Sequence, residues 1–287
     1  MKFCFLKSLR ISVMINIILS SGACLFFVAN CGNDLIRKTV VNDSNGKTKE
    51  IVYYKNNKQI ARVAFDQNMN KNGTEGKIID GIYFEYYTNG DKSGEWKYVD
   101  GVLNGTSKMY YRNGNIAAER VYRNGEEEGN SRTYHENGNI WRDYNLVGGK
   151  FEGMYIKYYE NGNKEYEEVY KNGVSEGVSK SFYSTGEMKQ LTSYINKDPK
   201  DSTVTEYYEN GALKEQGVYK DNKRSGVWKE YYDNGKLKSE HSYSNGVTTG
   251  LEKNYFENGK IEELNFYDKK GLRYTKAFDD RGNVIVD

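Results

Sequence analysis

A 24-residue repeat dominates the sequence from residue 81 onward. Each unit carries the phrase Tyr-Tyr-x-Asn-Gly or a close variant, and the glycine of that phrase is taken here as position 0 of its unit. These glycines follow one another at intervals of 24 or 25 residues, with a final interval of 23: Gly90, Gly114, Gly138, Gly162, Gly186, Gly211, Gly235, Gly259 and Gly282. A fixed period of this length predicts a repeat architecture in which each unit packs on its neighbours.

Other positions keep the same register. Position −9 is glycine in most units, as in Gly105 and Gly226, although Ser202 departs from this rule. Position +8 is tyrosine in most units, with Leu146 as an exception, and a second turn containing glycine follows. An earlier, weaker copy of the unit begins at Tyr53.

The Asn-Gly pair predicts the local fold of each unit. Both central residues of a type I′ turn need positive φ, and Asn-Gly between strand-like residues is a strong hairpin signal. Each unit is therefore expected to form a strand, a tight turn, a strand and a looser turn. A single hairpin is marginally stable in water, but stacked hairpins supply one another with partners. The sequence thus predicts an all-β fold, an elongated sheet of stacked antiparallel β-hairpins.

The expected register assigns residues to two faces. If Asn-Gly is a two-residue loop, position −3 lies opposite +2, and −9 lies opposite +8. The aromatic residues at −3, the aliphatic residues at +2, the tyrosines at +8 and Trp228 at −7 then share a face, which we expect to be the core.

Position −4 points the other way, beside mostly charged residues at −6 and mixed residues at +3. Its aromatic side chains form a candidate binding ribbon: Tyr86, Tyr110, Tyr134, Tyr158, Phe182, Tyr207, Tyr231 and Tyr255. A solvent-facing aromatic strip is a common recognition surface. The alternative is that these rings only pack across strands and hold the sheet together.

Three segments depart from the repeat. Residues 67–81 read as an insertion before the regular array, and residues 196–202, with the single proline Pro199, as an irregular loop. Residues 281–286 read as a closing strand that would cover an open sheet edge.

The first 31 residues resemble a bacterial lipoprotein signal. Basic residues precede an apolar run that ends at Cys31, which would be lipidated and become the first residue of the mature chain. Cys24 is a rival site, and an uncleaved membrane helix or an ordinary cleaved signal are the alternatives. We therefore divide the chain into a signal (1–31), a tether (32–47), a degenerate first repeat with an insertion (48–80) and the repeat array (81–287).

Charge and cysteine content restrict the function classes. Without Lys2, Lys7 and Arg10 of the signal, the chain has 39 basic and 40 acidic side chains, so no basic footprint for nucleic acid is expected. All three cysteines lie within the first 31 residues. The exported domain therefore has no internal disulfide, and its stability must come from packing and strand pairing.

Residues 226–235 (GVWKEYYDNG), followed by Tyr243 and Asn245-Gly246, carry a family resemblance. They resemble the MORN-variant repeat, the type found in the YwqK family of antitoxins, over roughly residues 50–287. The resemblance implies stacked β-hairpins and a binding or scaffold role, and it carries no catalytic residues. An antitoxin of that kind acts on a cytoplasmic toxin, which conflicts with an export signal.

The sequence shows no constellation typical of an enzyme. His135 occupies the aromatic −3 slot and His241 a mid-strand position, so both are expected to be variants of repeat positions. No Ser-His-Asp, His-Glu-His or phosphate-loop pattern appears, and we expect no cofactor and no metal site.

These observations predict a non-enzymatic repeat protein, lipid-anchored in the bacterial cell envelope, that presents a surface to a protein partner. One alternative is an antitoxin or immunity-like protein that neutralises a protein toxin. A further alternative is a cell-wall glycan- or choline-binding module. Cation–π capture of quaternary ammonium favours tryptophan, and only Trp96, Trp141 and Trp228 are present.

Overall fold

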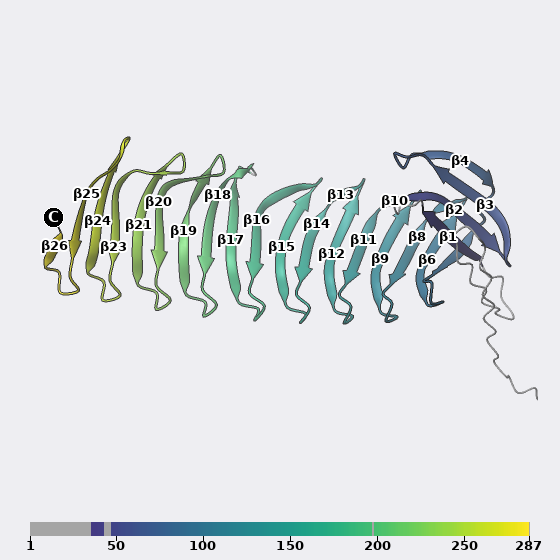
Figure 1. Cartoon of the computed structure of the whole chain (residues 1–287), viewed down its shortest axis with the longest axis horizontal. Coiled ribbons are helices and arrows are strands. Elements are labelled where there is room, and N and C mark those ends of the chain that lie inside the picture. Colours follow the sequence, from purple (N-terminus) through teal and green to yellow (C-terminus); the bar gives the residue numbers. More distant parts are fainter. Residues whose placement is uncertain (1–35, 43–46, 197, 287) are drawn as a thin grey trace, which may run out of the picture. The chain divides into compact units, whose positions relative to one another are not determined.

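The protein was analysed as a computed structural model, which describes residues 36–42, 47–196 and 198–286. These residues form 26 β-strands and contain no helix (Figure 1). The expected all-β fold of stacked antiparallel hairpins is confirmed. Cys31, Cys24 and the rest of the signal lie outside the described residues. The chain divides into two compact parts, one ending at Glu128 and one running from Gly129 to Asp287. These parts are called the first unit and the second unit below, whereas successive units are successive 24-residue repeats.

The first unit contains ten strands within its described residues. They are β1 (Ile36–Asn42), β2 (Thr48–Lys55), β3 (Lys58–Phe65), β4 (Lys71–Gly76), β5 (Gly81–Tyr86), β6 (Lys92–Val99), β7 (Val102–Leu103), β8 (Gly105–Tyr110), β9 (Ile116–Arg123) and β10 (Glu126–Glu127). Neighbouring strands pair antiparallel, except that β1 meets β5 in a short parallel contact at Arg37 and Phe84.

The first unit has a compact aromatic and aliphatic core. Tyr53 of β2, Tyr83 of β5 and Tyr98 of β6 are buried together, with ring centroids 5.0–5.6 Å apart in edge-to-face arrangements. Ala61 and Val63 of β3 complete the cluster. The core therefore depends on strands from the weak first copy of the repeat, which pack against the first regular hairpin.

Two segments before the array differ from the expectations. Residues 36–42, assigned to a tether, form strand β1, which pairs antiparallel with β2, and both Arg37 and Lys38 are buried there. Within the expected insertion, residues 71–76 form strand β4, which pairs with β3. Both segments thus belong to the folded part of the chain.

The second unit contains sixteen strands within its described residues. They are β11 (Gly129–Tyr134), β12 (Ile140–Val147), β13 (Lys150–Phe151), β14 (Gly153–Tyr158), β15 (Lys164–Lys171), β16 (Val174–Phe182), β17 (Met188–Ile195), β18 (Asp198–Tyr207), β19 (Leu213–Lys220), β20 (Lys223–Tyr231), β21 (Leu237–Ser244), β22 (Val247–Thr248), β23 (Gly250–Tyr255), β24 (Ile261–Asp268), β25 (Gly271–Phe278) and β26 (Val284–Val286).

These strands pair antiparallel in chain order, as Figure 1 shows for this unit. The expected closing strand is present as β26, which pairs with β25. The expected irregular loop at 196–202 is instead mostly strand. Pro199 lies in β18, and the register between β17 and β18 shifts where the extra residues are accommodated.

The turn at the repeat phrase is not the predicted type I′ turn. In the repeat phrase that ends at Gly235, Gly235 donates its N–H to the Tyr232 carbonyl at 2.9 Å, and Tyr232 donates its N–H to the Lys236 carbonyl at 2.8 Å. Gly235 has φ +81°, whereas Asn234 is not in the left-handed region. The loop therefore has three residues, a turn followed by a left-handed glycine.

The type I′ geometry occurs at the second turn, which we expected to be the looser one. Asn172 and Gly173 both have positive φ (52° and 78°), and Asn245 and Gly246 repeat the pattern (52° and 81°). Asparagine tolerates the left-handed region better than most residues, which explains its use there. In these two repeats, the two turns thus have different geometries although both read Asn-Gly.

The three-residue loop changes the register near the turn. Gly226 at −9 pairs with Tyr243 at +8, as predicted, but Tyr231 at −4 pairs with Leu237 at +2, which corrects the predicted pairing of −3 with +2. The shift between Glu230 and Tyr231 accommodates one extra residue, a β-bulge. Position +3 therefore shares the face of −5 and −3, and position +2 shares the face of −4, which is the reverse of the prediction.

Burial concentrates in one row that crosses the strands of the second unit. Positions −7 and +6 are neighbours in register, as in Trp228 and His241 or Glu168 and Ser179. Of the eight buried side chains among the described residues of the second unit, six lie in this row, and only two of the six are apolar: Ser131, Glu168, Ser179, Val204, Trp228 and Asn265. We call the face with positions −9, −7, −5, −3, +4, +6 and +8 the front face, and the opposite face the back face.

Candidate binding faces

The −3 aromatic residues connect successive units. The hydroxyl of Tyr208 donates to the backbone carbonyl of Tyr231 in the next unit at 2.8 Å, and Tyr232 donates to the Tyr255 carbonyl at 2.6 Å. Tyr87, Tyr159 and Tyr183 make the same bond, and His135 places Nε2 2.9 Å from the Tyr158 carbonyl. Position −3 therefore has a structural role, and His135 fills it as a variant.

The asparagine at −1 connects successive turns. Asn161 accepts a hydrogen bond from the Asn163 N–H at 3.0 Å and donates its side-chain N–H to the Ser184 carbonyl of the next unit at 2.7 Å. Asn137 makes the equivalent pair of bonds. The conserved phrase within the repeats thus encodes contacts between units as well as the turn itself.

The predicted −4 ribbon lies on the back face, but its rings are half-buried. Every one of its eight members, from Tyr86 to Tyr255, has intermediate burial. Several hydroxyls reach the side chain at +5 of the preceding unit: Tyr110 donates to Glu95 at 2.9 Å, Tyr255 lies 3.4 Å from Glu240, and Tyr231 accepts from Gln216 at 3.1 Å. Burial and the neighbouring Glu95 carboxylate raise the pKa of Tyr110 to about 12. The ribbon is therefore partly engaged within the sheet.

A ladder of ion pairs runs beside the ribbon on the back face. Basic residues at −6 meet acidic residues at +5, as in Lys229 with Glu240 at 3.3 Å and Lys180 with Glu167 at 3.1 Å. Glu167 also contacts Lys164 at 2.7 Å, and the hydrogen bond from that ammonium group holds the pKa of Glu167 below its usual range. Exposed pairs of this kind contribute little stability individually.

A third back-face row contains several exposed apolar side chains among polar ones such as Thr203 and Ser242, and the sequence reasoning did not single it out. Positions −8 and +7 pair with each other. At −8, Val227 is 54% exposed, and Leu251, at the same position of the next repeat, is 39% exposed. Phe266 stacks on Tyr274 with ring centroids 5.7 Å apart. Because side chains alternate along a strand, Trp228 on the core face at −7 predicts that position −8 points away from the core. The sequence therefore contained the pattern that identifies this row.

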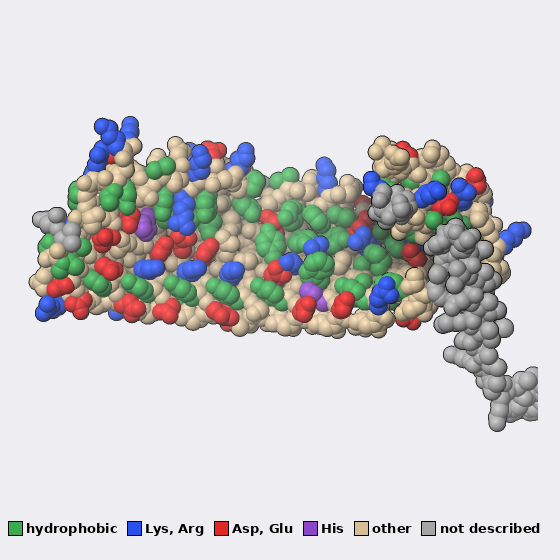
Figure 2. Space-filling view, in the orientation of Figure 1, with side chains coloured by type: hydrophobic (Ala, Val, Ile, Leu, Met, Phe, Trp, Pro, Cys, Tyr) green, Lys and Arg blue, Asp and Glu red, His purple; other side chains and the backbone are tan. Residues whose placement is uncertain are grey.

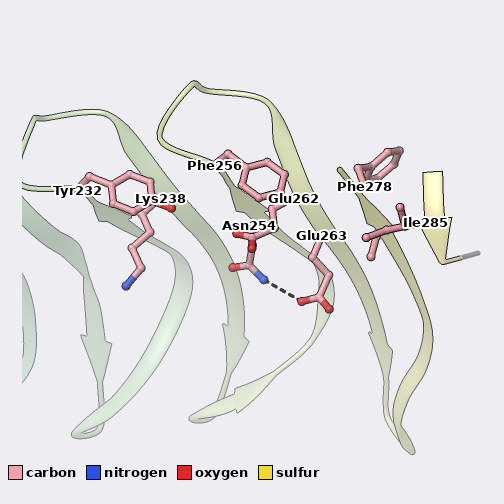
Figure 3. Close-up of a pocket in the computed structure, with 9 residues that line it drawn as sticks. Tyr232, Lys238, Asn254, Phe256, Glu262, Glu263, Phe278 and Ile285 are labelled. Carbon is pink, nitrogen blue, oxygen red and sulfur yellow. Dashed lines mark hydrogen bonds between the residues drawn. The ribbon is translucent and has the colours of Figure 1, made fainter. Parts of the chain in front are cut away.

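The front face carries the +3 charges, which the sequence reasoning placed on the back. Glu165 at +3 lies 2.6 Å from Lys157 at −5, and Lys238 lies 3.5 Å from Glu230 at −5. The β-bulge before +2 explains this exchange. Near the C-terminus, a cavity of about 420 Å³ lies among the −3 and +3 side chains of successive hairpins, including Tyr232, Lys238, Phe256 and Glu262 (Figure 3).

A cluster of aromatic side chains gathers at one place on the front face, over β12–β15 (Figure 2). It comprises Tyr144, Phe151, Tyr155, Tyr166 and Tyr170, with ring centroids 5.3–6.4 Å apart. Glu168 lies among these rings and is only 4% exposed. The sequence analysis placed Tyr170, at +8, on the expected core face, but it did not predict the cluster, which combines residues from two neighbouring repeats.

The contacts of the second histidine, His241, are also defined. His241 lies 3.4 Å from Glu252 and 2.9 Å from the Ser239 hydroxyl, within the buried row. The described part of the chain holds no group of three or more His, Cys, Asp or Glu side chains suited to a metal ion. Within the same residues, no helix is long and apolar enough to cross a membrane.

A family model described as "MORN repeat variant" matches seven segments: residues 103–124, 127–146, 151–172, 175–196, 200–221, 224–245 and 248–269. Together they cover just over half of the chain. No curated protein matches. Similar solved structures include the crystal structures of TcdB2-TccC3-TEV (10% identity, TM-score 0.20) and of TcdB2-TccC3 (14%, 0.19). A third is the Photorhabdus luminescens Tc holotoxin pore (12%, 0.19).

The chain spans only a small part of those structures. The three matches include 90%, 86% and 95% of this chain. They include only 16%, 18% and 16% of the respective chains in those structures.

Proposed function

The chain belongs to the MORN repeat variant family, and from this premise we propose that it is a non-enzymatic scaffold that binds a protein partner on its back face. The exposed apolar row at −8 and +7 is the observation that carries this proposal. Val178, Val227 and Leu251 occupy position −8 in three of four consecutive repeats, with 45%, 54% and 39% of their surfaces exposed, and Thr203 stands at this position in the repeat between Val178 and Val227. Repeated apolar side chains beside a charged row suit an extended protein contact.

The −4 ribbon completes this surface. Its half-buried rings lie across the ion-pair ladder from the exposed apolar row, so a partner lying along the back face would meet apolar, charged and aromatic rows in turn. Aromatic residues are enriched at the centres of protein interfaces. Because several ribbon hydroxyls already have partners within the sheet, we assign the main apolar contact to the −8 and +7 row.

Photo-crosslinking in cells tests the back-face contact. A photoreactive residue placed at Val178 or Val227 should capture one defined protein, whereas the same residue at the exposed turn position Glu209 should not. Equal capture at all three positions, or none at the back-face positions, would contradict the proposal. A captured toxin would instead support an immunity-like role, and binding of purified chain to cell-wall glycan would support the wall-binding alternative.

We further propose that Cys31 anchors the protein to a membrane of the bacterial cell envelope. Cys31 follows an apolar run and precedes a polar segment, the order found at lipidated cysteines. Metabolic labelling with a fatty-acid analogue should mark the wild-type protein and the Cys24→Ala variant, but not Cys31→Ala. Labelling that survives Cys31→Ala and disappears in Cys24→Ala would move the anchor to Cys24.

A further inference from the structure

Glu168 is a buried carboxylate with no cationic partner among the described residues. Both Tyr166 and Tyr170 donate their hydroxyl protons to Glu168 Oε2, at 2.5 Å in the case of Tyr166. Basic side chains on the neighbouring strands have other contacts: Lys157 pairs with Glu165, and Lys164 and Lys180 pair with Glu167. Arg142, opposite Lys157 on β12, lies over the Trp141 ring at 3.9 Å. Removing a carboxylate from water without an opposite charge is costly. A bound cation would offset that cost.

The position of Glu168 in the sheet explains its surroundings. Its cross-strand neighbours in the buried row are Tyr155 on β14 and Ser179 on β16. Tyr166 and Tyr170 flank it on the same face of β15, two residues away in each direction. Three tyrosine side chains therefore border the carboxylate. The basic Lys157 lies opposite Tyr166 on the same face, but its ammonium group pairs with Glu165.

The aromatic rings beside Glu168 suit a cation. Phe151 lies 5.3 Å from Tyr155 and 5.5 Å from Tyr170 between ring centroids, and these three rings are all half-buried. A cation within about 6 Å of such ring centroids is attracted by their π faces. The other carboxylate oxygen, Oε1, has no hydrogen bond among the described residues and is not one of the fully buried unpaired atoms. This oxygen therefore keeps a small solvent-accessible surface, although Glu168 as a whole is only 4% exposed.

We propose that Glu168, Phe151, Tyr155 and Tyr170 bind an alkylammonium group. The carboxylate supplies the opposite charge, and the rings supply the cation–π and apolar contacts that the carbon substituents of the ammonium require. An alkali metal ion fits less well, because aromatic rings leave its hydration shell without replacement oxygens. The site lies on the opposite face from the proposed protein contact, so neither proposal depends on the other.

Calorimetric titration of the full chain tests the site. The probes are choline chloride, a quaternary ammonium, and n-butylammonium chloride, a primary one, at constant ionic strength. Saturable binding of at least one probe is expected, and the two affinities tell whether the site prefers a quaternary or a primary ammonium group. The neutral isostere 3,3-dimethylbutan-1-ol should bind at least tenfold more weakly, because it lacks the charge.

Matched variants then locate the binding. Glu168→Gln should weaken the preferred probe at least tenfold, whereas Glu252→Gln should leave binding unchanged, because Glu252 lies in the same buried row but outside the aromatic cluster. Phe151→Leu keeps the carboxylate and should also weaken binding, so it decides the outcome if Glu168→Gln does not fold. Absence of saturable binding by both probes, or equal binding by Glu168→Gln or by the neutral isostere, would overturn the proposal.

Discussion

At the scale of single residues, the two adjacent tyrosines of the repeat phrase differ in their hydrogen bonds. Tyr208 at −3 donates to the backbone of the next unit, whereas the Tyr207 side chain at −4 lies on the back face and its hydroxyl has no hydrogen bond among the described residues. The sequence placed these two residues on opposite faces but did not distinguish their hydrogen bonding. That distinction depends on a carbonyl 23 residues away.

The first prediction compares this pair. Tyr208→Phe should lower the free energy of unfolding by about 1 kcal/mol, because it removes a hydrogen bond between units and leaves the Tyr231 carbonyl without that donor. Tyr207→Phe should change the free energy of unfolding much less. Urea unfolding followed by circular dichroism measures both. Equal effects of the two substitutions would show that the −3 hydroxyl does not connect the units.

The second prediction concerns alkaline pH. Burial and the Glu95 carboxylate raise the pKa of Tyr110 to about 12, above the value of about 10 for an unfolded tyrosine. The folded state therefore favours the neutral phenol, and the resulting stability is full below pH 10 and is lost as the pH rises toward 12.

Urea unfolding at intervals between pH 9 and pH 11.5 measures this loss. Tyr110→Phe, which has no phenol at this position, should show a shallower decline than the wild type. An identical decline in both proteins would mean that other groups account for the whole pH dependence.

At the scale of elements, a strand of the array can lie between two turns that look alike in sequence and differ in structure. β15 begins after the three-residue loop of residues 160–162 and ends at the type I′ turn of Asn172 and Gly173. In the first, asparagine acts through its side chain, with Oδ1 accepting from the backbone and Nδ2 donating to the next unit. In the second, it acts through its backbone, at φ +52°.

The third prediction uses this difference. Asn161→Gly should destabilise the protein by about 1 kcal/mol, because both side-chain hydrogen bonds are lost. Asn172→Gly should be close to neutral, since glycine adopts positive φ without steric cost. Thermal unfolding of the two variants provides the comparison. A larger loss from Asn172→Gly than from Asn161→Gly would contradict the two assigned roles.

The turn difference also explains which predictions about the faces succeeded. The pairing of Gly226 with Tyr243 follows from strand alternation far from the loop and was correct. The pairing near the loop was wrong, because a three-residue loop with a bulge adds one residue that the Asn-Gly pattern does not reveal. The +3 charges therefore moved to the front face, where Lys238 meets Glu230.

At the scale of the whole molecule, the two units are stabilised differently. The first has a cluster of buried aromatic and aliphatic side chains, including Tyr83 with no exposed surface. The second has a buried row that is mostly polar, with Trp228 as its largest fully buried side chain. Repeat arrays whose units contact only their neighbours lose and gain structure locally. A destabilising substitution in the second unit is therefore expected to loosen only the strands near it.

The fourth prediction tests this local response with Trp228→Ala. The indole packs against Gly217, where an added Cβ would lie 2.1 Å from the ring, and its Nε1 donates to the Val218 carbonyl at 3.1 Å. Removing the indole should lower the local free energy of unfolding by about 3–5 kcal/mol. Hydrogen exchange should accelerate in β19–β21, while β14 and β15 keep their protection. Uniform acceleration throughout the second unit would show that it unfolds as one cooperative body.

The sequence by itself determined the repeat, the hairpins, the antiparallel pairing and the separation of the −3 and −4 aromatic residues, because all of these depend on spacing within one unit. Only the tertiary structure decided the loop geometry, the exchange of +2 and +3, and the cluster around Glu168. Glu168 lies opposite Tyr155 and Ser179, which are 13 and 11 residues away along the chain, and this neighbourhood follows from the register between strands. A backbone bulge sets part of that register, and its energy depends on hydrogen bonds between strands, which spacing within one unit does not specify.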